Sequence, residues 1–549
     1  MNFTQFFYDW THGWHGLITA YLMVAVFQLA GQIRARASIS THAILPFTAI
    51  ATLAAVGIAE TFALYLLEKF AGLDANGRTE PMIAVILIMT FSFIGGIYWA
   101  KRRAPLVPVQ NRGAQLLDGT LAQMETRKRQ VVAAKKASTS RPLTMAGIAV
   151  PPEDETKHIK LMGTTGAGKS TILREVLHAA LSRGDRAVIA DPDGGYLSRF
   201  YDPDRGDVIL NPFDARSAKW NLLAEIRTNY DVDQLARSLI PDPGGNGDPQ
   251  WARYARTFFA SVVRQAQAVG VEDLAELYRI LTAATKEEIK LLVGGTPAAP
   301  FLEDGNEKMF GGIRSTTTEN IKCLDYIREQ TAPSVSVREW IRTGKGVLFL
   351  PYQADQIAAL RSIISTWMRL AIFQTMAMGE GDHRLWFAVD ELDALGAIDG
   401  LPDALARLRK FGGRCALGFQ SIAQVSTTYG NGPAQAMVEN CGNSLVLRCS
   451  ASESGGTARF ASRLIGEREI VRVNRSVNRG RGGDGKPHES ESHSEQYAVE
   501  SAVMASEIEQ LPDLTGYLKF ASQPAWMRVS FPVYQLPAVA VPFVPVQGA

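Results

Sequence analysis

Gly163-Thr164-Thr165-Gly166-Ala167-Gly168-Lys169-Ser170-Thr171 is the stretch of sequence that decides the fold. Its spacing fits G-x-x-x-x-G-K-[ST], the phosphate-binding P-loop. The glycines let backbone N–H groups turn toward an anion, the Lys169 side chain supplies positive charge to the β- and γ-phosphates, and the Ser170 hydroxyl can bind Mg²⁺. A strand ending at Met162 and a helix running on from Thr171 supply the required context. We therefore predict that all nine residues bind ATP, with Lys169 catalytic and Ser170 a ligand of Mg²⁺.

A second apolar strand, Leu385–Leu392, ends in the pair Asp390-Glu391. A carboxylate at a strand tip can hold Mg²⁺ through its water shell, and a neighbouring carboxylate can polarise the attacking water. We predict the metal role for Asp390 and the general-base role for Glu391. Downstream of a P-loop in an α/β chain, this strand is interpreted as a Walker B motif.

Two further strands of the predicted sheet bear on the site. Arg186–Gly195 follows the P-loop helix, so a right-handed crossover pairs the two strands in parallel and puts Asp191 at the carboxyl edge, where α/β sheets bind ligands. Arg414–Ser421 ends near the same edge. There Gln420 can sense the γ-phosphate or orient water, although an amide that only caps a loop is the alternative. The predicted fold class is α/β, a RecA-like P-loop NTPase domain.

A basic helix is predicted between the last two strands. Leu401–Phe411 carries Arg407, Arg409 and Lys410. These side chains can stabilise phosphoryl charge across a subunit interface or contact DNA. A solvated helix face is the competing interpretation.

Composition limits the classes that remain. The chain has 549 residues, enough for three or four domains, and its net charge of +2 excludes a global basic field. Contact with nucleic acid must therefore use a local patch. The four cysteines lack C-x-x-C spacing, which favours reduced core thiols over disulfides or a zinc site.

The first hundred residues have the composition of a membrane region. A helix that spans a bilayer needs about 20 mostly apolar residues, and Gly13–Ile33, Ala43–Leu67 and Met82–Ala100 each qualify. Basic residues at Arg34, Arg36 and Lys101–Arg103 predict three spans, an external N-terminus and a cytoplasmic body. In the alternative topology the first segment is interfacial and two spans remain.

We predict four consecutive regions. Residues 1–105 are transmembrane, 106–215 hold the P-loop, 216–332 form an inserted all-α domain, and 333–549 hold the Walker B strand and a C-terminal tail. Within the last region, the polar stretch Val471–Gln496 is typical of a flexible loop, with a DNA-contacting pore loop as the alternative. Pro532–Pro545 is expected to lie extended against the body.

With these motifs in place, the chain resembles the type IV coupling proteins of bacterial conjugation, the TrwB/TraD group within the FtsK- and HerA-like translocases. The stretches that carry the resemblance are Gly163–Thr171, Arg183–Pro192, Ile209–Asp214, Leu385–Leu392, Gly418–Ser421 and Leu511–Tyr517. They cover about residues 150–549, so the resemblance is more specific than a lone P-loop.

The resemblance implies a multi-pass ATPase of the bacterial inner (cytoplasmic) membrane whose bodies assemble as a homo-hexamer. Such proteins deliver relaxase-bound plasmid DNA to the channel proteins of a type IV secretion system, without reading the DNA sequence. It also implies that an arginine from the neighbouring subunit completes the site. Arg409 fills that place and Gln420 that of the sensor, although Leu408 stands where the family has glycine.

Two other functions are compatible with these residues. The first is a docking receptor whose nucleotide cycle gates assembly and which transports nothing. The second is an ATPase of the same fold that couples protein effectors, in place of DNA, to secretion.

Overall fold

The computed structural model describes residues 21–22, 24–30, 32, 49, 90–98, 109–118, 142–242, 249–451, 456–481 and 487–546. No helix in these ranges is both long enough and apolar enough to span a membrane. The three predicted membrane segments lie mostly outside the described residues.

The chain forms two compact units. One comprises residues 1–112 and 469–499, and the other comprises 113–468 and 500–549. The second unit contains every predicted site residue. The predicted division at residues 105, 215 and 332 stays a prediction.

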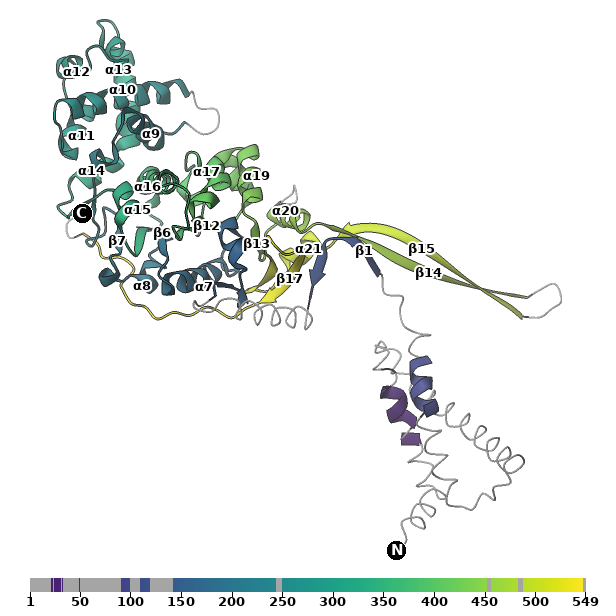
Figure 1. Ribbon diagram of the computed structural model, residues 1–549. Helices are drawn as coiled ribbons and strands as arrows, with labels where there is room; N and C mark the ends of the chain where they lie inside the picture. The colour runs from purple at the N-terminus through teal and green to yellow at the C-terminus, as the bar shows by residue number, and fades with distance from the viewer. Residues whose placement is uncertain are drawn as a thin grey trace, which may run out of the picture. The chain divides into compact units, whose positions relative to one another are not determined.

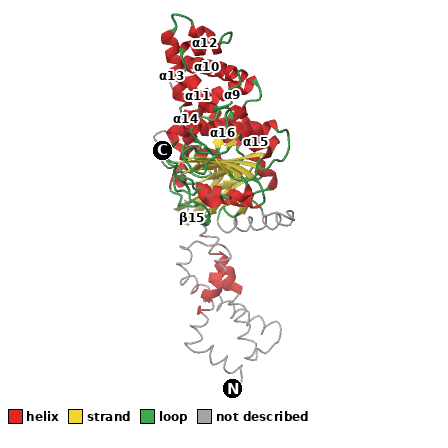
Figure 2. Ribbon diagram, turned by 90° about the vertical axis from the view of Figure 1, so that its left-hand side faces the viewer, coloured by secondary structure: helices red, strands yellow, loops and turns green. Residues whose placement is uncertain are grey.

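A ten-stranded mixed sheet forms the centre of the second unit (Figure 2). In sheet order its strands are β2 (Gln115–Leu117), β17 (Ala525–Ser530), β16 (Thr515–Lys519), β13 (Asn443–Val446), β5 (Ile159–Met162), β12 (Gly413–Phe419), β11 (Leu385–Val389), β6 (Arg186–Pro192), β10 (Val347–Tyr352) and β7 (Val208–Ile209). From β13 to β7 all neighbours are parallel, whereas β16 runs antiparallel to both β13 and β17. The mixed α/β fold confirms the predicted class.

Helices cover both faces of this sheet, so its central strands are apolar along their whole length. On one face α7 (Lys169–Ser182) and α8 (Leu197–Phe200) share a core with Ile189 and Ala388. On the other face Val188 and Phe387 belong to a larger core. The helices packed there are α15 (Val337–Thr343), α16 (Ile357–Ala377), α17 (Leu401–Leu408), α18 (Ile422–Tyr429), α19 (Asn431–Asn440), α20 (Gly456–Ile465) and α21 (Ala505–Glu509). All four cysteines are buried and free within the described part of the chain, as predicted.

The segment between β7 and β10 is largely helical and rises from the second face (Figure 1). Its helices are α9 (Asn229–Leu239), α10 (Pro249–Ala268), α11 (Leu274–Thr282), α12 (Lys286–Leu292), α13 (Glu307–Ile321) and α14 (Cys323–Arg328). Below them the short strands β8 (Lys219–Trp220) and β9 (Ser334–Val335) pair in parallel. Trp220 packs edge-on against Trp367 of α16, with ring centroids 5.9 Å apart, and so joins the insertion to the sheet layer.

The prediction of a flexible loop at Val471–Gln496 was wrong for most of that stretch. β14 (Glu467–Arg481) and β15 (Pro487–Ser501) form a long hairpin, and β1 (Val109–Gly113) pairs with β14 (Figure 1). Near its base the Glu469 carboxylate accepts hydrogen bonds from Asn111 Nδ2 at 2.6 Å and from Arg112 Nη2 at 2.8 Å. Cross-strand backbone pairing overrides a composition that disfavours an apolar core.

The C-terminal segment lies extended against the body, as predicted. The Val539 N–H donates to the Ser198 carbonyl at 2.8 Å, and the Ala215 N–H donates to the Val544 carbonyl at 2.8 Å. Pro545 forms a bridge with Asp214. Because prolines keep the chain extended, these few backbone bonds suffice to hold it.

A buried histidine at the start of β5 links three elements and makes stability depend on pH. His158 Nδ1 accepts the Cys415 N–H at 3.0 Å, so Nε2 carries the proton and donates to the Leu405 carbonyl at 2.9 Å. Burial lowers the pKa of His158 to about 4, compared with roughly 6.5 in the unfolded chain. The unfolded state therefore binds the proton first as the pH falls. The contribution of His158 to the free energy of unfolding is present above about pH 6.5 and is lost as the pH falls from about 6.5 to 4.

We expect His158 to cost wild type about 1 kcal/mol of stability between pH 7.5 and 5.5. His158→Gln, which cannot titrate, should have a lower thermal midpoint at pH 7.5 but a smaller further loss at pH 5.5. His383→Gln, on a surface loop, should keep the wild-type pH dependence. Equal pH dependence in wild type and His158→Gln would contradict the assignment.

Candidate nucleotide-hydrolysis site

The P-loop connects the carboxyl end of β5 to the first turn of α7. Gly166 and Gly168 have φ angles of +79° and +119°, which a side chain rarely adopts. A Cβ atom added at Gly166 would meet nothing within 4 Å, so the space beside this glycine is open. The backbone conformation suits a phosphate cradle at a helix N-terminus.

Lys169 lies beneath this loop with only 5% of its surface exposed. Its Nζ donates to the carbonyls of Gly163 at 2.7 Å and Thr164 at 3.1 Å. Burial lowers the pKa of Lys169, and the nearby carboxylates Asp390 and Glu391 raise it in part. The ammonium group is thus held at the loop between backbone oxygens and two acidic side chains.

Asp390, at the end of β11, uses its two oxygens differently. Oδ2 accepts hydrogen bonds from Ser170 Oγ at 2.7 Å and Tyr196 OH at 2.9 Å. Oδ1 is buried and has no hydrogen-bond partner among the described residues. A serine hydroxyl beside an incompletely paired carboxylate is a donor set that suits hydrated Mg²⁺. These residues therefore fit the predicted metal.

Glu391 points toward the adjacent strand end. Gln420 Nε2 donates to Glu391 Oε1, and Thr165 Oγ1 of the P-loop donates to Gln420 Oε1 at 3.2 Å. Burial raises the pKa of Glu391, and the charge of Asp390 raises it further. A carboxylate with a raised pKa is a stronger base, which suits the predicted role.

Gly418 explains how the two strand ends come so close. A Cβ atom there would clash with the Asp390 carbonyl oxygen, and the Leu392 N–H donates to the Gly418 carbonyl at 3.1 Å. Any larger residue would push β11 and β12 apart. The glycine thus sets the spacing between Asp390 and Gln420.

One cavity of about 160 Å³ brings most of the predicted residues together. It is lined by Thr165, Gly166, Gly168, Lys169, Ser170, Thr171, Asp390, Glu391 and Gln420. Gly163, Thr164 and Ala167 belong to the same loop but do not line the cavity. The arrangement can hold a phosphate chain between the loop and two carboxylates.

Arg409 is a predicted site residue that lies away from both the cavity and the P-loop. It is exposed in the turn Arg409–Phe411, directly before β12 begins. The cavity lies beyond the other end of β12, a strand of seven residues, which corresponds to roughly 20 Å. Arg409 therefore does not contact the site of its own chain.

The sequence did not predict a role for Tyr196, and for Asp191 it predicted only a position at the carboxyl edge of the sheet. The buried Asp191 carboxylate accepts the backbone N–H groups of Tyr196 at 2.9 Å and Leu197 at 2.6 Å, which fixes the turn into α8. This turn carries the Tyr196 hydroxyl to Asp390. Burial raises the pKa of Asp191 to about 7. The only available signal was an aromatic residue soon after an acidic strand end.

Known proteins resemble the chain in sequence over most of its length. It is 32% identical over 419 residues to the coupling protein TraD of Escherichia coli (strain K12), covering 75% of this chain and 57% of TraD. It is 26% identical over 364 residues to a conjugal transfer protein TraG of Escherichia coli, covering 58% and 56%. The chain therefore spans less than two thirds of these relatives.

Solved structures of the plasmid coupling protein TrwB share the fold. The TrwB complex with ADP and Mg²⁺ has 29% identity and a TM-score of 0.68, covering 81% of this chain and 99% of that one. The complex with the non-hydrolysable ATP analogue ADPNP gives the same values.

A family model described as the type IV secretion-system coupling protein DNA-binding domain matches residues 142–532. This match contains the P-loop, the helical insertion, and the ends of β11 and β12. The chain belongs to this family of type IV secretion-system coupling proteins.

Proposed function

We propose that this protein is an ATP-driven, hexameric DNA translocase of the bacterial inner membrane, which recruits a relaxase–DNA substrate to a type IV secretion channel during conjugation. The observation that carries the proposal is the convergence of Lys169, Ser170, Asp390, Glu391 and Gln420 on one cavity. Family membership supports DNA as the substrate, and the TrwB complexes support ATP and Mg²⁺ as cofactors.

The hydrogen bonds around the cavity indicate how each residue would act on ATP. The Lys169 ammonium exchanges its carbonyl partners for phosphate oxygens, and the loop N–H groups hold the same phosphates. Ser170 and Asp390 would hold Mg²⁺, which when bound neutralises charge on the β- and γ-phosphates. Glu391 accepts a proton from the attacking water, and Gln420, already bonded to Glu391, orients that water.

The proposed ring supplies the group that each site lacks. Arg409 is exposed and distant from the cavity of its own chain, which suits a role in the neighbour's site. The proposal keeps the four predicted regions of the chain. The first region anchors the ring in the membrane, and their ranges are 1–105, 106–215, 216–332 and 333–549.

The central experiment separates nucleotide binding from turnover. Lys169→Ala should lose most ATP affinity and all DNA-stimulated hydrolysis, because the phosphates lose their buried cation. Glu391→Gln should bind ATP normally yet lose at least about a hundredfold in kcat, as expected for a missing general base.

Three outcomes would decide against the proposed function. If DNA does not change ATP turnover by the wild-type assembly at low salt, the protein is not a DNA translocase. Plasmid transfer that survives in Glu391→Gln would favour the docking receptor, and co-purification with effector proteins in place of relaxase would favour the effector-coupling ATPase.

A mixing experiment tests the place of Arg409. Arg409→Ala should lower kcat by roughly a thousandfold or more while its own cavity still binds ATP. Mixing it with Lys169→Ala should restore part of the activity, because each subunit type supplies what the other lacks. Arg407→Ala, an exposed neighbour on α17, is the matched control and should remain active. Mixtures as inactive as their components would rule out sharing of sites.

Tyr196 should act as a positioning residue for Asp390. If Ser170 were to bind Mg²⁺, the Tyr196 hydroxyl would remain as the donor to Asp390 Oδ2. Tyr196→Phe should therefore weaken Mg²⁺-dependent ADP binding by roughly tenfold or more, with little effect on binding measured in EDTA. Calorimetric titration checks this. Tyr201→Phe is the control, and an unchanged Mg²⁺ dependence in Tyr196→Phe would contradict the role.

A further inference from the structure

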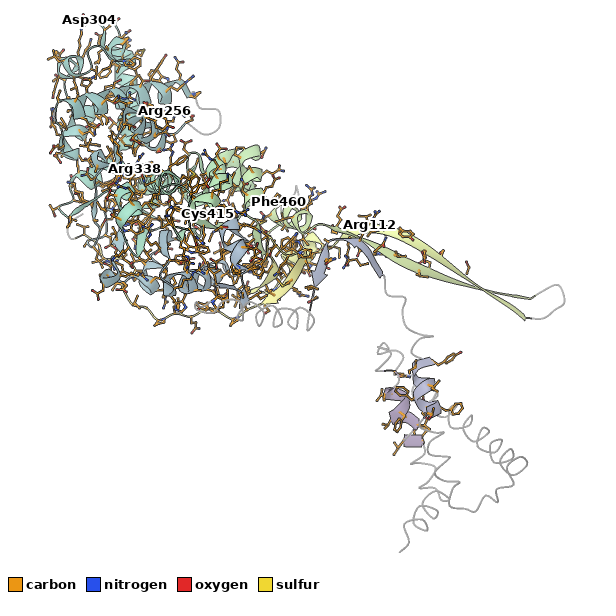
Figure 3. All side chains as sticks on the ribbon, in the orientation of Figure 1. Arg112, Arg256, Asp304, Arg338, Cys415 and Phe460 are labelled. Atoms are coloured by element: carbon orange, nitrogen blue, oxygen red, sulfur yellow. The ribbon has the colours of Figure 1, made fainter. Side chains whose placement is uncertain are left out.

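A large cleft in the described part of the second unit lies away from the nucleotide cavity. Its volume is about 1110 Å³, and the helical insertion forms one wall. On α9 the lining residues Tyr230, Gln234 and Arg237 follow helical spacing and so share one face. On α10 Arg253 and Arg256 do the same. Figure 3 shows Arg256 on the part of the insertion closer to the sheet.

Two arginines on the lining have no acidic partner in the described part of the chain, because the carboxylates of the lining are already paired. Each carboxylate on it has an arginine partner: Asp233 with Arg264, Asp242 with Arg256, and Asp399 with Arg369. Arg237 and Arg253 are exposed and make no ion pair with any described residue. Two guanidinium groups are therefore free to bind an anion in a cleft whose own acids are already neutralised.

An aromatic side chain lies on the same wall. Tyr230 is 68% exposed, which is unusual for a large ring on a soluble surface. Unpaired bases stack on such rings, whereas a duplex offers no open base face along its length. Arginines beside an exposed ring are the combination that binds single-stranded nucleic acid without reading its sequence.

The opposite wall comes from the ATPase core. Thr427–Gly430 line the cleft at the end of α18, the helix that begins just after Gln420. Asp399 lines it after the segment that follows Asp390-Glu391. Tyr429 joins the two segments, since its hydroxyl accepts the Ile398 N–H at 3.0 Å and donates to the Gly396 carbonyl at 3.3 Å. A strand held here would contact elements that begin at the nucleotide.

We infer that this cleft grips the phosphate backbone of single-stranded DNA, with Arg237 and Arg253 on the phosphates and Tyr230 stacked on a base. The inference rests on the proposed function, to which it adds a location and the single-stranded form of the substrate.

The test measures binding of labelled oligo(dT) to the full-length protein by fluorescence anisotropy over a salt series. Arg237→Gln/Arg253→Gln should bind more weakly, and its slope of log affinity against log salt should be shallower by about 1.4, or 0.7 for each lost phosphate contact. Arg237→Lys/Arg253→Lys should keep most of the slope. Tyr230→Ala should lose roughly fivefold or more in affinity for oligo(dT) and none for a duplex of the same length.

The matched charge control is Lys290→Gln/Lys308→Gln, on exposed lysines of the same insertion that do not line the cleft. Lys290 lies 3.9 Å from Asp304, which Figure 3 shows at the far end of the insertion. This control should keep the wild-type slope. Equal slopes for the control and the arginine double variant would show that the cleft is not the DNA site, even if DNA stimulates ATP turnover by wild type. Wild type that neither binds nor responds to DNA would instead overturn the proposed function.

Discussion

Parallel pairing of four central strands is the constraint on which the site depends. β5, β12, β11 and β6 are neighbours in the sheet, although β5 and β6 precede the helical insertion and β11 and β12 follow it. Because parallel strands share a carboxyl edge, the P-loop, Asp390 and Gln420 meet at that edge. The hydrogen bond of 2.7 Å from Ser170 Oγ to Asp390 Oδ2 joins the P-loop helix to the end of β11 at this edge. If β11 ran the other way, its Asp-Glu pair would lie at the opposite edge.

The cavity concentrates negative charge before any ligand binds. Asp191, Asp390 and Glu391 are close enough that the charge of Asp390 raises the pKa of both neighbours, in addition to the effect of burial. Lys169 offsets only part of this charge. A divalent cation bound there would relieve the repulsion that folding imposes on these carboxylates. The same residues that prepare the site for Mg²⁺ therefore leave the free protein electrostatically strained, and nucleotide with metal should stabilise it.

The sequence predicted the parts of the molecule that follow from local pattern. Apolar strands ending in Gly, Asp-Glu or Gln located the sheet and its active edge, because such strands must be buried on both faces. The hairpin of β14 and β15 was not predicted, because its strands are polar and lack the apolar alternation by which a strand is recognised in a sequence. Tyr196 was missed for a similar reason. Its place beside Asp390 depends on the turn that the Asp191 carboxylate caps, and the spacing of apolar residues in the sequence does not predict such a turn.

The position of Arg409 also bears on regulation. β12 separates this arginine from its own cavity by roughly 20 Å, and the strand is buried in the sheet centre, so no side-chain movement can close that distance. A single subunit could then bind nucleotide without the positive charge that stabilises phosphoryl transfer. On the proposed assembly, hydrolysis would begin only where a neighbour presents its Arg409. Residues of α18 and of the segment after β11, two elements that begin beside the nucleotide cavity, also line the arginine-bearing cleft. ATP turnover and the grip on DNA would thus depend on the carboxyl ends of β11 and β12, and assembly on Arg409 at the opposite end of β12.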